Sequence, residues 1–180
     1  MKLKIFTFIL ACFFLVVCSQ KTTTSTEDAV KEPFIVTFEA STIDGETITS
    51  DCFADSKLTM LNVWATYCNP CLREMPDLGE IAVSYDSSDF QMLGAISDIS
   101  VFSEADAIAA AVELIEKTGA TTYPHLLLNE SLYQNLIGGV DSVPTTFFIN
   151  KQGELLGYVV GSRSKETWKG LIDELLAEMD

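Results

Sequence analysis

The sequence is poor in positive charge. Its 180 residues include 11 lysines and arginines against 26 aspartates and glutamates, a formal net charge of −15. A surface of that sign repels nucleic acid phosphates, so we expect no nucleic acid partner, and the charge otherwise serves solubility. Only five prolines and a hydrophobic content of 48% exclude a largely disordered protein. No repeat of about 20 to 50 residues occurs, which excludes a solenoid.

Metal ligands are also scarce. His125 is the only histidine, and Cys68 and Cys71 form the only Cys-x-x-Cys pair. A structural zinc site takes four ligands, usually two such pairs or one pair with histidines. Beyond the pair, the chain after residue 18 offers only Cys52 and His125, far apart in sequence, and no haem-binding Cys-x-x-Cys-His occurs. We therefore expect neither a metal nor another cofactor.

The N-terminus carries a targeting segment. Lys2 and Lys4 precede a nearly all-apolar run at 5–17, which is shorter than the roughly 20 residues of a membrane span and fits a secretory signal peptide. No Ala-x-Ala cleavage site follows. "LVVCSQ" instead resembles a bacterial lipoprotein lipobox, which implies cleavage before Cys18 and a lipid on its thiol, although Val17 stands where such motifs usually carry Gly, Ala or Ser. An uncleaved anchor and ordinary secretion are the alternatives, and all three place the protein outside the cytoplasm.

The rest of the chain predicts a flexible tether followed by one α/β domain. Residues 18–33 are polar and Thr-rich, without apolar periodicity. From residue 34, we expect a hairpin around Asp44-Gly45 and buried strands at 58–65, 90–97, 123–128 and 143–150, the last paired with an antiparallel strand at 154–161. Helices are expected at 72–85, kinked at Pro76, at 105–117, and from Ser164 to Met179. This order predicts a central mixed β-sheet flanked by helices.

Cys68 and Cys71 stand between a predicted strand and a predicted helix. A bridge between them closes a loop of only a few residues, so a purely structural disulfide would stabilise the fold little. At a helix N-terminus, unpaired N–H groups and the helix dipole favour a thiolate, so Cys68 can attack a substrate disulfide. Cys71, one turn on, can resolve the mixed disulfide, and Pro70 fits the first turn. The placement favours redox exchange.

Two separated motifs carry a family resemblance. "WATYCNPC" (64–71), "SVPTTFFI" (142–149) and the "GEL" hairpin (153–155) resemble the thioredoxin superfamily. "LNVWATYCNPCLREMP" (61–76) resembles the membrane-tethered TlpA/ResA-like thiol-disulfide oxidoreductases, often called redoxin or AhpC/TSA-like domains. The resemblance covers about residues 34 to 178. It implies a thioredoxin-like fold with an inserted strand and helix, which the segment around 90–128 can supply.

The resemblance also implies roles for individual residues. Cys68 becomes the nucleophile and Cys71 the resolving thiol. Pro144 matches the cis-proline of the family, with Val143 before it, in a segment that faces the cysteine pair and binds the incoming peptide. Glu74 matches an acidic residue that lies near the dithiol and tunes or shuttles protons, and a solvated helix carboxylate is the alternative of equal weight.

Other residues have a packing interpretation beside a functional one. Trp64 and Tyr67 flank the pair, and Trp64 is a candidate for shielding the disulfide and contacting a substrate. Asn62 stands where thioredoxin has a buried aspartate, which makes Glu74 the better candidate for proton transfer. Cys52 is expected to be a small buried hydrophobic residue rather than a third redox thiol. His125 is expected to be structural.

The direction of electron flow follows from charge. Asn69-Pro70 between the cysteines adds no positive charge, and Arg73 is offset by Glu74, so little beyond the helix dipole stabilises a thiolate. A reductant is favoured, and the family implies a transmembrane electron donor of the CcdA/DsbD type. Its substrates would be disulfide-bearing exported proteins, such as apocytochrome c or methionine sulfoxide reductase. A peroxiredoxin-like peroxidase, a disulfide-forming oxidase and a non-catalytic binding lipoprotein remain as alternatives.

Overall fold

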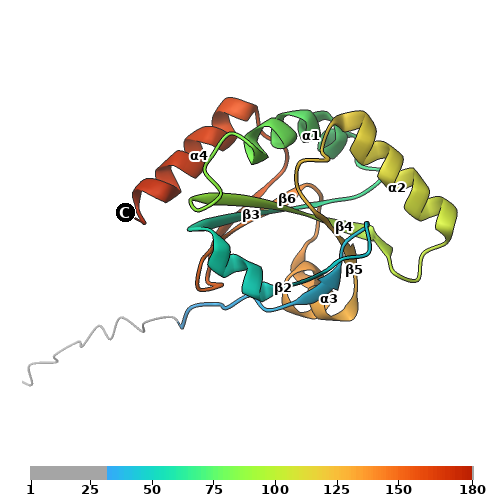
Figure 1. Ribbon diagram of the computed structural model, residues 1–180, viewed down its shortest axis with the longest axis horizontal. Helices are drawn as coiled ribbons and strands as arrows, with labels where there is room; N and C mark the ends of the chain where they lie inside the picture. Colours follow the sequence, from blue (N-terminus) through green and yellow to red (C-terminus); the bar gives the residue numbers. More distant parts are fainter. Residues whose placement is uncertain (1–31, 180) are drawn as a thin grey trace, which may run out of the picture. The chain divides into compact units, whose positions relative to one another are not determined.

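The structure is a computed structural model that describes residues 32–179. Its elements, in chain order, are β1 (Glu39–Ser41), β2 (Thr47–Thr49), the 3₁₀ helix η1 (Ser50–Asp55), β3 (Leu58–Trp64), α1 (Asn69–Ala82), β4 (Phe90–Ser100), α2 (Ala105–Thr118), β5 (His125–Leu128), α3 (Glu130–Asn135), the 3₁₀ helix η2 (Ile137–Gly139), β6 (Thr145–Asn150), β7 (Leu155–Val160) and α4 (Lys165–Ala177) (Figure 1). The predicted signal peptide, Cys18 and the predicted tether up to residue 31 lie outside the described residues. Within 32–179, no helix is both long and apolar enough to cross a membrane.

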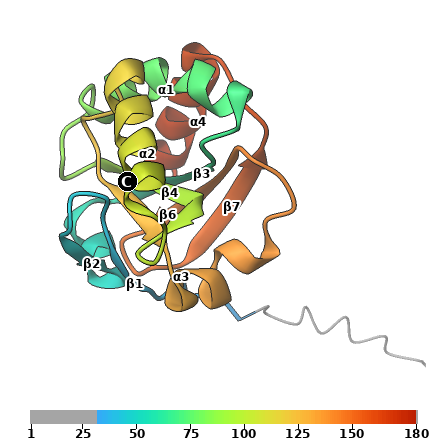
Figure 2. The same ribbon diagram turned by 90° about the vertical axis from the view of Figure 1, so that its right-hand side faces the viewer.

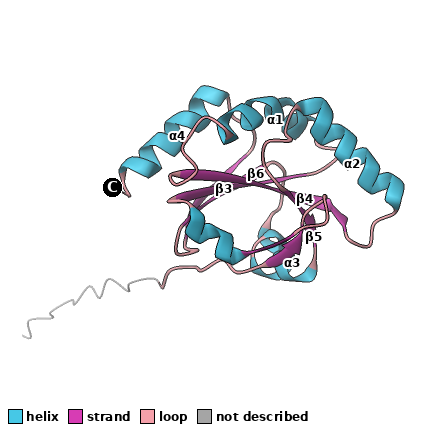
Figure 3. Cartoon of the chain, viewed as in Figure 1, coloured by secondary structure: helices cyan, strands magenta, loops and turns pink. Residues whose placement is uncertain are grey.

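Five strands form a mixed sheet in the order β5-β4-β3-β6-β7. β3 runs parallel to β4 and antiparallel to β6, β4 runs parallel to β5, and β6 and β7 form an antiparallel hairpin. Helices α1, α2 and α4 cover one face, while α3 and the β1–β2 hairpin lie on the other (Figures 1 and 3). Figure 2 shows the same arrangement turned by 90°. The predicted α/β fold with a central mixed sheet is confirmed.

The central strand β3 is buried along its whole length. Both faces of the sheet are covered, so the residues of β3 form a nearly continuous apolar run, broken by Thr59 and Asn62, rather than an alternating one. Met60 and Trp64 belong to the core beneath α1, α2 and α4, and Leu61 and Val63 belong to the core on the opposite face. This packing fixes the end of β3, where the cysteine pair follows.

Several local predictions are confirmed. β1 and β2 pair antiparallel around Gly45, whose φ of +89° suits a glycine. Helix α1 has Pro70 in its first turn, and it covers 69–82 instead of 72–85. It continues through Pro76, where the expected kink stays a prediction. Helix α2 ends before Gly119, at φ +70°. Ser164 caps α4 by accepting the N–H of Thr167.

Other boundaries differ from the predicted ones. β4 continues to Ser100 instead of ending at 97, and β6 begins after Pro144 because proline has no N–H for the ladder. Helix α3 was not predicted. It has only six residues and one buried side chain, Leu132, so it shows no helical periodicity. Its start is set by Asn129, whose side chain accepts the N–H of Leu132. Between β4 and β6 the chain forms α2, β5 and α3. The inserted strand and helix that the family resemblance implies around 90–128 stay a prediction.

Candidate active site

Cys68 and Cys71 form a disulfide with Cα atoms 5.3 Å apart. Cys68 is the N-cap of α1, and its Sγ accepts the N–H of Cys71 at 3.2 Å. Cys68 keeps 5% of its surface exposed, while Cys71 is fully buried. Cys68 is therefore the cysteine of the pair that keeps surface for a partner, and the first-turn N–H of Cys71 points at its sulfur, where it favours a thiolate.

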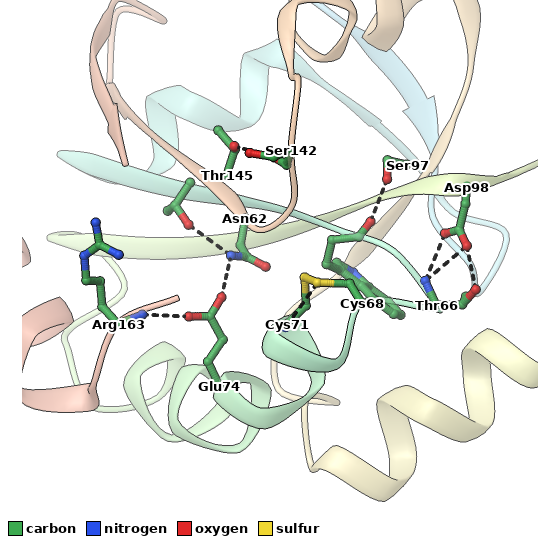
Figure 4. Close-up of a disulfide and its surroundings, with 12 residues drawn as sticks. Asn62, Thr66, Cys68, Cys71, Glu74, Ser97, Asp98, Ser142, Thr145 and Arg163 are labelled. Atoms are coloured by element: carbon green, nitrogen blue, oxygen red, sulfur yellow. Dashed lines mark hydrogen bonds between the residues drawn. A yellow bond between two sulfur atoms is a disulfide. The ribbon is translucent and has the colours of Figure 1, made fainter. Parts of the chain in front are cut away.

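The turn between β3 and the cysteines is tied to the end of β4 (Figure 4). The carboxylate of Asp98 accepts the backbone N–H of Thr66 at 3.1 Å and the Thr66 hydroxyl at 2.5 Å. Ser97 donates its hydroxyl to the carbonyl of Trp64 at 3.0 Å. These bonds hold Cys68 in place relative to the sheet.

The peptide bond between Val143 and Pro144 is cis, as the family resemblance implied. In the sheet, Thr145 pairs with Val63, so Pro144 lies at the end of β3 from which the cysteines follow. The Thr145 hydroxyl donates to the carbonyl of Ser142 at 2.7 Å (Figure 4). Pro144 is buried and Val143 is half-buried. Their contact with a substrate stays a prediction.

Glu74 is buried beneath α1, with 4% of its surface exposed. Its Oε2 accepts the backbone N–H of Arg163 at 3.1 Å and Nε1–H of Trp168 at 3.4 Å, and its Oε1 accepts Nδ2–H of Asn62 at 3.3 Å. Burial raises the pKa of Glu74, although these donors and the Arg163 charge oppose the rise. Glu74 is thus not a solvated helix carboxylate but an enclosed titratable group on the same face of α1 as Cys71.

Asn62 completes this buried network. Its Nδ2 also donates to the Thr146 hydroxyl at 3.0 Å. Its Oδ1 is buried and has no hydrogen-bond partner among the described residues. From the sequence, Asn62 stood out only as a departure from thioredoxin. The sequence feature that could have indicated this buried network is an amide side chain in a strand whose other residues are nearly all apolar.

Trp64 is fully buried and belongs to the same core cluster as Cys68 and Cys71. Its Nε1–H donates to Nδ1 of His125 at 3.2 Å, and Nε2–H of His125 donates to the carbonyl of Ala120 at 2.8 Å. Burial lowers the pKa of His125 to about 4, so the ring is neutral. The burial of Trp64 argues against direct contact with a substrate, whereas Tyr67, 72% exposed beside Cys68, has free surface.

Cys52 lies apart from the pair, in η1, and is half-buried. Burial, with the charges of Asp55 and Asp51, raises the pKa of its thiol to about 11, which keeps it protonated. Nothing here supports a third redox thiol. Across residues 32–179, no three His, Cys, Asp or Glu side chains gather closely enough to hold a metal ion.

A family model described as the AhpC/TSA family matches residues 32–157. The chain belongs to the AhpC/TSA family. It is 27% identical over 121 residues to the thiol-disulfide oxidoreductase ResA of Bacillus thuringiensis (strain Al Hakam), covering 66% of this chain and 64% of that relative. The match to ResA therefore spans less than two thirds of that protein. The thioredoxin-like protein YneN of Bacillus subtilis (strain 168) is 29% identical over 136 residues, or 76% of this chain and 75% of the relative.

A solved structure shows the same fold. The pneumococcal exposed lipoprotein thioredoxin (Etrx1) of Streptococcus pneumoniae strain TIGR4 superposes with a TM-score of 0.62 at 26% identity, covering 77% of this chain and 98% of the other. The thioredoxin-like fold and the TlpA/ResA-like resemblance are thereby confirmed.

Proposed function

We propose that this protein is a thiol-disulfide oxidoreductase that reduces disulfides in exported proteins through Cys68 and Cys71. One observation carries the proposal: the pair forms a disulfide at the N-terminus of α1, with Cys68 slightly exposed and Cys71 fully buried. That asymmetry separates an attacking thiol from a resolving one. The names of ResA and YneN, a thiol-disulfide oxidoreductase and a thioredoxin-like protein, support the same activity.

The proposed reaction has two exchange steps. The Cys68 thiolate attacks one sulfur of the substrate disulfide, a mixed disulfide forms, and the other substrate sulfur leaves as a thiolate that takes a proton. Cys71 then loses its proton, and its thiolate attacks Cys68 Sγ and releases the second substrate sulfur. The substrate gains two electrons and two protons, and Cys68 and Cys71 end as the disulfide.

Glu74 is the proposed acceptor of the Cys71 proton in the second step. It lies on the buried face of α1, one turn beyond Cys71, and its raised pKa brings it closer to the pH at which a general base works best. Val143 and Pro144 are the proposed peptide-binding segment, because they lie at the end of the sheet where the cysteines lie.

The proposed direction is reduction. The exposed residues next to Cys68 are Tyr67, Asn69 and Pro70, none of them cationic, and the chain carries a net charge of −15. Without added positive charge, the thiolate gains about 0.3–1 kcal/mol from the helix N-terminus. A strongly oxidising protein needs far more, since DsbA lies about 150 mV above thioredoxin, or roughly 7 kcal/mol.

We also propose an extracytoplasmic location, with residues 1–17 as a signal peptide, Cys18 as the lipidated residue, 18–33 as the tether and 34–180 as the thioredoxin-like domain. The similarity to Etrx1, an exposed lipoprotein, supports this arrangement. A membrane donor of the CcdA/DsbD type would re-reduce the pair. Disulfide-bearing exported proteins, such as apocytochrome c or methionine sulfoxide reductase, are the proposed substrates.

The reduction potential of the Cys68–Cys71 pair tests the proposal. The full chain is equilibrated in dithiothreitol or glutathione buffers and the free thiols are counted by alkylation. A value near or below about −220 mV is expected of a reductase, and a value near about −120 mV would make the protein a disulfide-forming oxidase. Insulin disulfide reduction should disappear in Cys68→Ser, and a wild-type protein that reduces no insulin would point to the binding-lipoprotein alternative. Faster turnover of peroxide than of disulfide would favour the peroxidase.

A further inference from the structure

Asn62 contributes one of two buried side-chain atoms that lack a hydrogen-bond partner among residues 32–179, the other being the hydroxyl of Tyr123. The orphan atom is the amide oxygen, Oδ1, of a side chain that is 1% exposed. An unpaired buried acceptor costs roughly 1–3 kcal/mol. Such an atom beside a reactive centre therefore needs a physical account.

The neighbours of Asn62 determine which way its amide faces. Nδ2 donates to Oε1 of Glu74 at 3.3 Å and to the hydroxyl of Thr146 at 3.0 Å. A carboxylate only accepts hydrogen bonds, so the amide nitrogen is the atom that must face Glu74. Oδ1 is consequently turned away from Glu74.

The direction left to Oδ1 is toward the cysteine pair. Asn62 and Trp64 project from the same face of β3, beneath α1, because side chains two apart share a face. Cys71 precedes Glu74 by three residues on α1, so both side chains point down from neighbouring positions on one helix face. Figure 4 shows the amide nitrogen of Asn62 on the side of Glu74 and its oxygen on the side of the disulfide.

We infer that Asn62 is a positioning residue for the dithiol, and that its Oδ1 accepts a hydrogen bond from Sγ–H of Cys71 once the disulfide is reduced. Reduction adds two electrons and two protons, breaks the S–S bond and leaves a thiol on each cysteine. The thiol of Cys71 is fully buried, so its S–H group needs an acceptor inside the protein. Oδ1 is then unpaired only in the oxidised state.

This inference rests on the proposed exchange reaction. The hydrogen bond would affect both the reduction potential of the pair and the order in which its two thiols react. It stabilises the dithiol relative to the disulfide, because only the dithiol satisfies Oδ1. It also favours the protonated form of Cys71, since a hydrogen bond to the neutral form disfavours the charged one. Cys71 would keep its proton until the mixed disulfide forms, which leaves Cys68 as the attacking thiolate.

Asn62→Leu and Thr146→Val in the full chain separate this role from general packing. Asn62→Leu removes the acceptor, so the equilibrium constant for reduction by dithiothreitol should fall about three- to tenfold, a lowering of the potential by ~14 to ~30 mV. Thr146→Val disturbs the same network but leaves Oδ1 and the bond from Nδ2 of Asn62 to Glu74 in place, so the equilibrium constant of this variant should stay close to that of the wild type. No change in Asn62→Leu, or an equal change in both variants, would overturn the inference.

The infrared S–H stretching band of the reduced full chain gives a second test that needs no Asn62 variant. Cysteines outside the pair keep their state during reduction and cancel in a reduced-minus-oxidised difference spectrum, which leaves Cys68 and Cys71. The band of Cys71 is the one absent from the spectrum of the reduced Cys71→Ser protein. A band below the frequency of a free thiol is expected, and a free-thiol frequency would sink the inference. If the Cys71 thiol is hydrogen-bonded but the protein reduces no substrate, the proposed function is wrong and the inference about Asn62 stands. A pair that resists reduction would overturn both.

Discussion

His125 is a buried histidine that folding keeps neutral, and this sets a pH dependence of stability. Its two ring nitrogens bond Trp64 and Ala120, and burial lowers its pKa from 6.5 to about 4. The unfolded chain therefore binds a proton at a higher pH than the folded one. The free energy of unfolding is expected to fall as the pH drops from about 6.5 toward about 4, by up to ~1.4 kcal/mol per pH unit, and this residue has no such effect above that window.

The matched variant for that prediction is His125→Gln, whose amide can still accept from Trp64 and donate to Ala120. Urea unfolding of both proteins is followed between about pH 4 and pH 8. Carboxylates titrate in both and cancel, so the stability advantage of the wild type over the variant should shrink as the pH falls. An advantage that stays constant across this range would contradict the prediction.

For individual residues, the sequence predicted the two reactive cysteines better than the side chains and hydrogen bonds around them. Cys68 and Cys71 follow from spacing and placement, because a helix N-terminus and a second thiol one turn on are local features. The burial of Glu74 is not local. It depends on Trp168 and the backbone of Arg163, about 90 residues further along the chain. From the sequence, a site role and a solvated position of Glu74 had equal weight, and the helical period that joins Cys71, Met75 and Leu78 was the one signal for its burial.

Strands β4 and β5 come together at Gly94, where a glycine leaves room for the ring of His125. A Cβ built on Gly94 would lie 2.3 Å from Nδ1 of His125, the atom that accepts from Trp64. Gly94→Ala must displace this ring, and it should lower the free energy of unfolding by about 1–3 kcal/mol.

Gly157→Ala is the control for Gly94→Ala, because a Cβ at Gly157 in β7 meets nothing within 4 Å. Its free energy of unfolding, from the same denaturant titration, should stay within about 0.5 kcal/mol of the wild type. Similar losses in the two alanine variants would show that the contact with His125 is not what makes Gly94 necessary.

At the scale of elements, long periodic segments were predictable and short ones were not. Helices α1, α2 and α4 each repeat apolar residues over several turns, and β3 is a nearly continuous apolar run, so their types follow from pattern. Helix α3 lacks the length for a pattern and depends on its cap and on packing by Leu132. The cis bond before Pro144 came from the family resemblance, because cis remains a minority state at about 5–6% of such bonds.

The whole molecule carries a net charge of −15, while the residues exposed next to Cys68 are uncharged. The electric field that acts on an approaching substrate therefore comes from charged residues farther from Cys68. Salt screens the effect of such distant charges. The Debye length falls from about 30 Å at 0.01 M to about 8 Å at 0.15 M ionic strength. Electrostatic steering thus predicts a rate that depends on the substrate's charge and on salt.

Two synthetic peptides with the same disulfide loop, one flanked by lysines and one by glutamates, test this prediction. The reduced full chain is mixed with each, and the second-order rate is followed by loss of free thiol on Cys68. The lysine peptide should react about tenfold faster at 0.01 M than at 0.15 M ionic strength, and the glutamate peptide should show the opposite trend. A peptide flanked by serines controls for effects of salt on the chemical step. If all three peptides respond to salt alike, the net charge does not select substrates, and specificity must arise from contacts at Val143, Pro144 and Tyr67.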